Sequence, residues 1–161
     1  MQKSRLCAQK KKPDKPVVAL DTNIFVSAFL SPEGPAAQIV SLIWRGKLQA
    51  CYNQAMLDEY SEVLSRSRFR FKISQSDIQE VVETIKRDGL FYDVQPSAFL
   101  MRDETDRVFY DTAKAAKASL VTGNKKHYPD EPFILTPREF LDTLDTPDQS
   151  NNTDSVLSSR S

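Results

Sequence analysis

The segment Val17-Val18-Ala19-Leu20-Asp21-Thr22-Asn23 is a run of four apolar residues followed directly by polar ones. Such a run is typical of a short strand that is buried on both faces of a parallel sheet. Ligands of open parallel sheets bind beyond the carboxyl ends of the strands. Asp21 is therefore the first candidate site residue, although an Asx-turn, or a helix N-cap that opens residues 24–30, would explain it equally well on these grounds.

Similar short apolar segments alternate with helical patterns along the rest of the chain. Further strands are expected at residues 48–52, 90–94, 119–122 and 133–135. Helices are expected at residues 36–44, 54–64, 76–87, 104–117 and 137–144, the last with Pro137 at its first position. This alternation predicts an α/β protein in which one parallel sheet carries helices on both faces.

One folded domain is expected over residues 16–144, between two tails of unlike composition. Residues 1–15 hold six Lys or Arg side chains and few apolar ones, so burial cannot offset the entropy of ordering this flexible basic tail. Residues 145–161 are rich in Ser, Asp and Asn and include Pro147, and a disordered polar tail is expected there. A length of 161 residues with 40% hydrophobic residues suits a single core.

Charge and cysteine content narrow the class of protein. Lys plus Arg equals Asp plus Glu at 22 each, so no overall field draws the chain toward nucleic acid or an acidic membrane. The two cysteines give no disulfide framework, as is typical of a reducing compartment. Without a bilayer-length apolar run or a signal-peptide core, a cytoplasmic protein with no membrane partner is expected.

A second candidate acid is Glu59, in the helix expected over residues 54–64. This helix has an apolar stripe that includes Tyr60, and at about 100° per residue Glu59 lies on the border of that stripe. Asp58 and Glu62 point away from it. A carboxylate that leans toward a core without a basic neighbour requires a cation or a raised pKa, while a surface glutamate is the open alternative.

A third candidate is Asp106, in the helix expected over residues 104–117. It shares its side of the helix with Phe109 and is expected to face the sheet, whereas Asp111 is expected on nearly the opposite side. Capping is the open alternative: Asp103 would be the N-cap and Asp106 would reach back to it.

The fourth candidate is Asn124, which follows a buried strand by way of Gly123. A strand-to-loop turn would explain the same residues, and Thr122 or Asn124 could instead hold a metal-bound water. The single histidine, His127, is interpreted as an ordinary loop residue, with contact to substrate as the open alternative.

These candidates supply only oxygen donors, without histidine or thiolate. Such a set suits the hard ions Mg²⁺ or Mn²⁺ and not Zn²⁺. Its members are Asp21, Glu59, Asp106 and Asn124.

In their order and spacing, these segments resemble the PIN domain, and in particular the branch assigned to toxin components of toxin–antitoxin pairs. The resemblance spans nearly the whole folded region. It is carried by residues 18–25, 57–66, 103–109 with 118–124, and 134–141. Thr-Gly-Asn at 122–124 stands where the branch often has Thr-Gly-Asp, which is one charge fewer for a second metal.

By position, the resemblance matches Asp21, Glu59 and Asp106 to the three principal acids of the family. Asn124 matches its fourth polar residue, and Asp103 matches a further acid of the branch. Further site candidates are Thr22, Asn23 and Thr122.

The resemblance implies a three-layer α/β/α fold with about five parallel strands and a Mg²⁺- or Mn²⁺-dependent ribonuclease that cuts within RNA. In this hypothesis Asp21 and Asp106 bind the metal directly or through water. Glu59 completes the shell or positions the attacking water, and Asn124 orients water. The implied partners are the RNA substrate and a small antitoxin protein, with a homodimer left open.

Two other functions stay open at this point. A PIN-like module without activity would bind RNA or protein, although the presence of all three principal acids argues against it. A phosphoacceptor domain would use Asp21, but phosphatases of the haloacid dehalogenase type need another aspartate two residues later, where this chain has Asn23.

Overall fold

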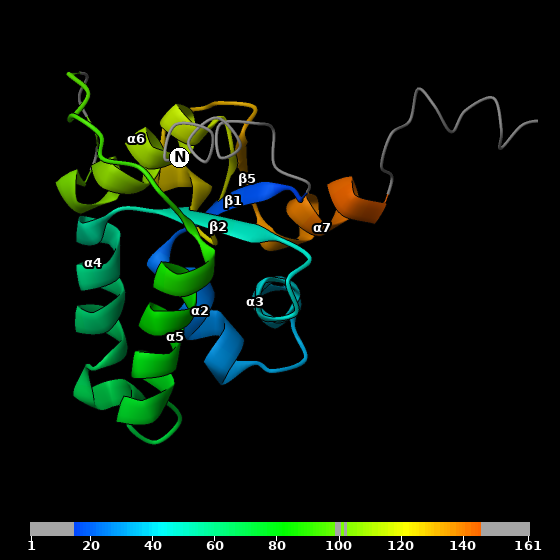
Figure 1. Cartoon of the computed structure of the whole chain (residues 1–161), viewed down its shortest axis with the longest axis vertical. Helices are drawn as coiled ribbons and strands as arrows, with labels where there is room; N and C mark the ends of the chain where they lie inside the picture. Colours follow the sequence, from blue (N-terminus) through cyan, green and yellow to red (C-terminus); the bar gives the residue numbers. More distant parts are fainter. Residues whose placement is uncertain (1–14, 99–100, 102, 146–161) are drawn as a thin grey trace, which may run out of the picture.

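The structure, a computed structural model, describes residues 15–98, 101 and 103–145 (Figure 1). Both expected tails lie outside the described residues except for Lys15 and Asp145. Five described strands form one sheet in the order β3-β2-β1-β4-β5, and every neighbouring pair is parallel. They are β1 (Val17–Leu20), β2 (Gln49–Tyr52), β3 (Leu90–Phe91), β4 (Ser119–Val121) and β5 (Ile134–Leu135).

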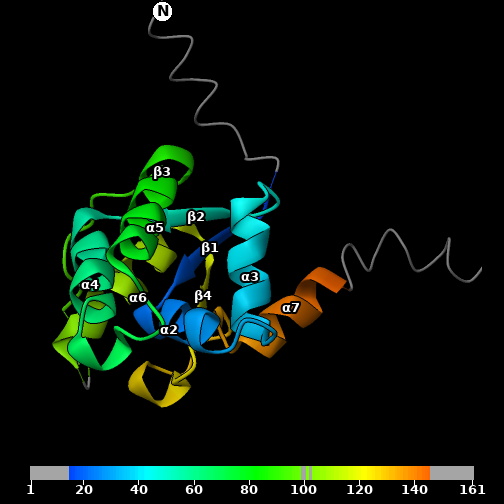
Figure 2. The same cartoon turned by 90° about the horizontal axis from the view of Figure 1, so that it is seen from below.

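Six described α-helices cover the two faces of the sheet. Figure 1 shows α6 above the strands, and α2, α3, α4 and α5 below them. In Figure 2, α7 lies beside α3, against which it packs. The helices are α2 (Thr22–Leu30), α3 (Pro35–Trp44), α4 (Gln54–Leu64), α5 (Gln75–Asp88), α6 (Arg107–Ala116) and α7 (Pro137–Asp145). The expected three-layer α/β/α fold with about five parallel strands is confirmed.

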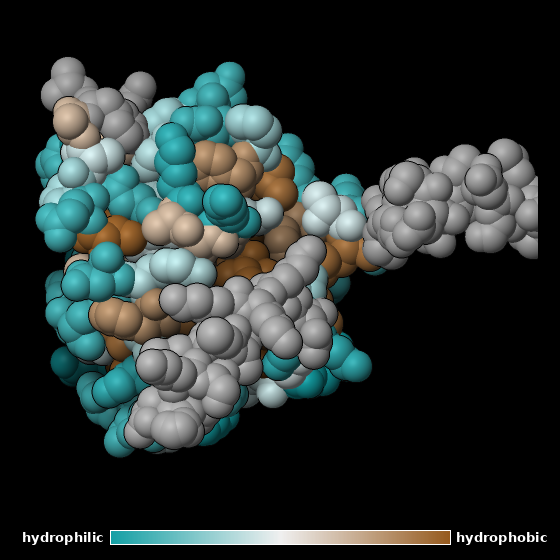
Figure 3. All heavy atoms as spheres, turned by 45° about the horizontal axis from the view of Figure 1, so that its top comes forward, coloured by the Kyte–Doolittle hydropathy of each residue, from teal (hydrophilic) through white to brown (hydrophobic). Residues whose placement is uncertain are grey.

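The core is centred on β1, where Val18, Ala19 and Leu20 are at most 1% exposed. Strand β1 pairs with β2 on one side and β4 on the other, so continuous apolar sequence is what a central strand requires. Figure 3 turns the top of Figure 1 toward the viewer and shows hydrophobic patches separated by hydrophilic residues. No helix in the described ranges is long and apolar enough to cross a membrane.

The end of β3 and the start of α6 differ from the expected bounds. Strand β3 ends at Phe91 and not at residue 94, because its partner β2 ends at Tyr52, where Asn53 begins the cap of α4. The helix expected over residues 104–117 is a 3₁₀ turn, η2 (Glu104–Asp106), followed by α6. Two further 3₁₀ turns, η1 (Ser67–Phe69) and η3 (Lys125–His127), were not expected from the sequence.

The segment after β3 packs back against α6. Ser97 donates its backbone N–H to Asp111 Oδ2 at 3.0 Å, and Arg107 Nη1 donates to Ser97 O at 2.8 Å. Asp111 does lie away from Asp106 around the helix, but it is only 8% exposed because this segment covers it.

Candidate metal centre

Asp21 lies at the carboxyl end of β1 with its carboxylate held by two hydroxyl groups. Its backbone N–H donates to Val121 O at 3.0 Å, which extends the pairing with β4 by one residue. Oδ2 accepts hydrogen bonds from Thr122 Oγ1 at 2.9 Å and Tyr128 OH at 2.8 Å. Asp21 occupies the N-cap position of α2, yet its side chain makes no capping bond. The N-cap alternative therefore explains its backbone position only.

Thr122 ties the loop after β4 to the loop after β1. Besides donating to Asp21, its hydroxyl accepts from Asn124 N at 3.0 Å and from Asn23 Nδ2 at 3.4 Å. Asn23 Oδ1 in turn accepts from Gly123 N at 3.0 Å. A hydroxyl has one donor and two acceptor positions, so these described partners engage Thr122 fully. This geometry suits holding Asp21 in place.

Asp106 lies at the junction of η2 and α6 and carries a buried oxygen, Oδ2, that accepts no hydrogen bond from a described residue, with His127 Nδ1 at 3.4 Å from it. The residue is 8% exposed. Burial is the main cause that raises the pKa of Asp106 from 3.8 to about 6, followed by the charges of Asp21 and Asp103; His127 opposes the shift. A buried carboxylate in this state is stabilised by a proton or by a cation.

The capping alternative holds for Asp103 and not for Asp106. Asp103 Oδ1 accepts from Thr105 N at 3.0 Å and from Thr105 Oγ1 at 2.9 Å, which lowers the pKa of Asp103. Asp106 makes no capping bond with its side chain. Asp103 thus begins the 3₁₀ turn that turns Asp106 inward.

Glu59 is partly buried on α4, whereas Asp58 and Glu62 on the same helix are exposed, as the position of the apolar stripe predicted. Burial is the first cause that raises the pKa of Glu59, and the charge of Glu62 is the second. Asp21 and Asp103 raise it further, while Arg66 lowers it. The carboxylates of three separate elements therefore act on one another through space.

The donor set fits a hard divalent cation. The negative charges of Asp21, Asp103 and Glu59 all act on the carboxyl group of Asp106, whose Oδ2 accepts no hydrogen bond from a described residue. Among the described residues, no three His, Cys, Asp or Glu side chains already converge as ligands of one ion. Mg²⁺ usually keeps several waters and takes only one or two protein carboxylates, so the arrangement suits an ion held partly through water.

His127 lies in the loop after β4, as expected, and its ring there reaches the carboxylate of Asp106. Its Nδ1 lies 3.4 Å from Asp106 Oδ2, and its Nε2 lies 3.2 Å from Asn124 Nδ2. The 3₁₀ turn η3 causes this, because residues three apart in such a turn lie above one another. The three-residue spacing from Asn124 to His127 was the available sequence signal. Tyr128 was missed, and no sequence pattern pointed to it.

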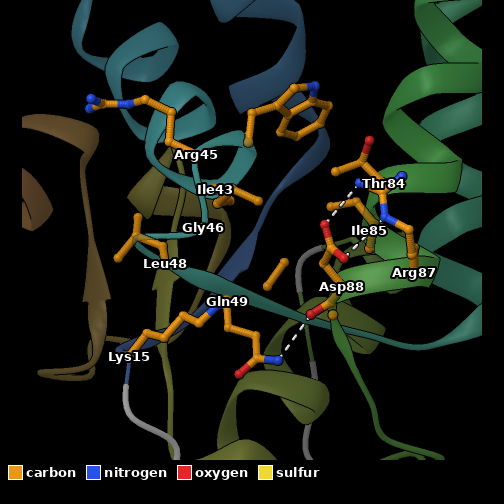
Figure 4. A pocket seen from close by; sticks show the side chains of 13 residues that line it. Lys15, Ile43, Arg45, Gly46, Leu48, Gln49, Thr84, Ile85, Arg87 and Asp88 are labelled. Atoms are coloured by element: carbon orange, nitrogen blue, oxygen red, sulfur yellow. Dashed lines mark hydrogen bonds and ion pairs between the residues drawn. The ribbon is translucent and has the colours of Figure 1, made fainter.

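A separate pocket of about 490 Å³, drawn in Figure 4, lies at the opposite, amino end of the sheet. Gln49 donates to Asp88 O there at 2.9 Å, and Lys15 lines the same cavity. Helices α3 and α5 both end at this pocket, so their carbonyl ends favour a cation such as Lys15 over a phosphate. The carboxylate cluster lies outside it.

Three comparisons relate the chain to known proteins. Residues 17–126 match the family model described as PIN domain. The chain is 26% identical to the uncharacterized protein MJ1680 of Methanocaldococcus jannaschii over 118 residues, which cover 73% of this chain and 76% of that protein. The fold is similar to that in the crystal structure of VapBC2 from Rickettsia felis bound to a DNA fragment from their promoter. The TM-score is 0.54 and the sequence identity is 17%. The alignment covers 74% of this chain and 96% of that one.

Proposed function

Because this chain belongs to the PIN-domain family, we propose that it is a metal-dependent ribonuclease that hydrolyses phosphodiester bonds within RNA. The observation that carries the proposal is the buried Oδ2 of Asp106, which has no hydrogen-bond partner among the described residues. The charges of Asp21, Asp103 and Glu59 all raise the pKa of Asp106. A divalent cation would relieve this repulsion.

Asp21 and Asp106 would hold Mg²⁺ or Mn²⁺, directly or through water. Such an ion activates water near neutral pH and neutralises charge that develops on the phosphate. Thr122 and Tyr128 engage Oδ2 of Asp21 and thereby leave its Oδ1 for the cation. Asn124, whose amide lies beside His127, would orient a water molecule. Glu59, on the facing helix, would complete the site or position the attacking water.

Basic side chains near the acids would hold the RNA backbone against their repulsion. Arg66 pairs with Glu62 at 2.8 Å, and Lys125 pairs with Glu139 at 3.0 Å. Both pairs are exposed, and exposed ion pairs contribute about 0–1 kcal/mol. Either cation can therefore exchange its carboxylate partner for a phosphate at little cost.

We further propose that the protein is the toxin component of a toxin–antitoxin pair in the cytoplasm. Its support is the resemblance of its motifs to the toxin branch and the fold shared with VapBC2. A small antitoxin would neutralise the acidic site with a basic side chain. Copurification from the native host with a small protein that suppresses cleavage tests this partner, and sizing of the pure chain tests a homodimer.

Cleavage of labelled RNA tests the proposed activity. Single-stranded and hairpin RNAs are incubated with the full chain in Mg²⁺, in Mn²⁺ and in EDTA. We expect internal cleavage with either metal, none in EDTA, and loss of cleavage in Asp106→Asn. The exposed Asp58→Asn is the matched control on α4 and should cleave normally. Binding of RNA without hydrolysis under any of these conditions would favour a non-catalytic binding module.

A further inference from the structure

A cavity of about 580 Å³ lies beside the carboxylate cluster, between the start of α4, the segment after β3, and α6. Its apolar lining comes from Ala55, Val94, Pro96 and Val108. Two buried polar residues, Asn53 and Asp111, line the same cavity, and each is 8% exposed. Apolar walls with a few placed polar groups are typical of sites for small ligands.

Asn53 brings an unused donor to this cavity. Its Oδ1 caps α4 by accepting from Ala55 N at 2.9 Å and Met56 N at 3.4 Å. Both of these bonds use Oδ1, and the two N–H groups of Nδ2 donate to no described residue. Because Asn53 lines the cavity, a ligand or water there can accept a hydrogen bond from this amide.

Asp111 brings an unused acceptor. Its Oδ2 accepts from Ser97 N at 3.0 Å, whereas no described residue donates to its Oδ1. Arg107 fixes the wall beside it by donating to Ser97 O at 2.8 Å and pairing with Glu104 at 2.7 Å. The side chain of Arg107 is only 12% exposed, so this wall of the cavity is well defined.

The cavity is a near neighbour of the candidate metal centre. Asn53 begins the helix that carries Glu59, and at 1.5 Å per residue the two positions are roughly 9 Å apart along the axis. Glu104, another lining residue, belongs to the same 3₁₀ turn as Asp106. An RNA strand with one phosphate at the acids can therefore place a flanking base in the cavity.

We propose that this cavity binds an unpaired guanine base of the RNA, next to the phosphate that is cleaved. The inference rests on the proposed ribonuclease function and assigns it a base preference. Guanine presents two adjacent N–H donors, N1–H and N2–H₂, to the carboxylate of Asp111, where Oδ1 is unused and Oδ2 keeps a second lone pair beside its bond from Ser97 N; guanine O6 accepts from Asn53 Nδ2. Uracil has one N–H between two carbonyl oxygens that a carboxylate repels. Adenine and cytosine each have a single amino donor on this edge.

Equilibrium binding tests the cavity separately from catalysis. The probes are GMP, IMP, AMP, CMP and UMP, titrated into the full chain in EDTA and followed by NMR or calorimetry. IMP is the sharpest comparison, because it lacks only the N2 amino group of GMP. One bidentate base contact corresponds to about 1–3 kcal/mol, so GMP should bind roughly tenfold or more tightly than the others. Equal binding of all five, or of none, would overturn the inference.

Two variants and one control assign the contacts. Asn53→Asp keeps the oxygen that caps α4 and removes the Nδ2 donor, so it should weaken GMP binding about tenfold without lowering Tm. Asp111→Asn replaces part of the acceptor and should abolish the preference of GMP over IMP. Asp58→Asn lies outside the cavity and should change nothing. An unchanged ranking of nucleotides in both cavity variants would show that the cavity is not the base site.

Cleavage of short single-stranded RNAs that each carry one guanine separates this inference from the function on which it rests. Cleavage next to the guanine supports both. Cleavage without base preference, together with no selective binding of GMP, would support the ribonuclease function and contradict the guanine site. Selective binding of GMP by a chain that cuts no RNA would support the guanine site and contradict the ribonuclease function.

Discussion

Tyr128 donates its hydroxyl to Asp21 Oδ2 at 2.8 Å, across 107 residues of sequence. Thr122 donates to the same oxygen at 2.9 Å, so two buried hydroxyls hold one face of the carboxylate. Burial first, and then the charge of Asp21, raise the pKa of Tyr128, which keeps the phenol a neutral donor. This arrangement fixes the orientation of Asp21 and leaves Oδ1 as its available oxygen.

Tyr128→Phe should therefore weaken Mn²⁺ binding several-fold, because Asp21 loses one of its two positioning donors. Mn²⁺ titration followed by electron paramagnetic resonance measures the effect. Tyr60→Phe is a matched control, since Tyr60 is also buried and donates to Leu20 O at 2.7 Å without touching a carboxylate. Both variants should lose about 1–3 kcal/mol of stability, but only Tyr128→Phe should lose metal affinity. Equal affinities in the two variants would contradict the positioning role.

Asp106→Asn should reduce turnover by orders of magnitude and weaken Mn²⁺ binding, because the variant keeps the side-chain size and removes the charge. The metal-free variant should unfold at the same or a higher temperature, since it has less repulsion with Asp21 and Asp103. Thermal unfolding and single-turnover cleavage measure the two effects. A lower Tm with normal metal affinity would instead mean that Asp106 is a structural residue.

Asp111 lies away from Asp106 around the helix, as expected, but it is buried and hydrogen-bonded and so is not a neutral position. Asp111→Ala should lower stability by roughly 1 kcal/mol, because it removes the acceptor for Ser97 N and leaves that donor covered by the chain. Chemical denaturation measures the change. An unaltered unfolding midpoint would show that the segment after β3 contributes little to stability.

Stability should depend on pH through Asp106. The pKa of Asp106 in the folded chain is about 6, above its ordinary value of 3.8, so the native state holds this proton more firmly than the unfolded state does. In the absence of metal, the contribution of this group to stability is therefore largest below about pH 4 and is lost as the pH rises through 6. Asp106→Asn should remove that slope. Added Mg²⁺ should raise Tm more at pH 8 than at pH 5, since the ion binds the ionised carboxylate; a gain independent of pH would contradict this.

Glu59→Gln and Glu62→Gln form a matched pair on α4. Glu59 is partly buried and its pKa is raised by burial and by neighbouring carboxylates, so its neutral variant should lose most of the RNA cleavage. Glu62 is exposed and pairs with Arg66, and its loss should alter stability by less than about 1 kcal/mol. Cleavage rates at saturating RNA measure the contrast. Similar rates in the two variants would place Glu59 outside the site.

Sequence alone determined the α/β architecture and the inward acids, because both follow from local spacing. Short apolar runs such as Val17–Leu20, with helical patterns between them, indicate a parallel sheet. Asp21 follows the central strand directly in the sequence, so its place at the end of that strand was known in advance. The helical period likewise placed Glu59 at the border of its buried stripe and turned Asp58 to solvent. The periodic spacing of apolar residues is a property of a short segment, so these features could be predicted without knowing how the rest of the chain folds.

Only the tertiary structure decided which groups surround those acids. The contacts of Tyr128 with Asp21 and of His127 with Asp106 depend on the path of the loop after β4, which no periodicity describes. Asp111 is buried because the segment after β3 crosses α6, although its helix alone would leave it facing outward. Contacts between residues distant in sequence are set by how elements pack, and packing reflects the whole chain at once.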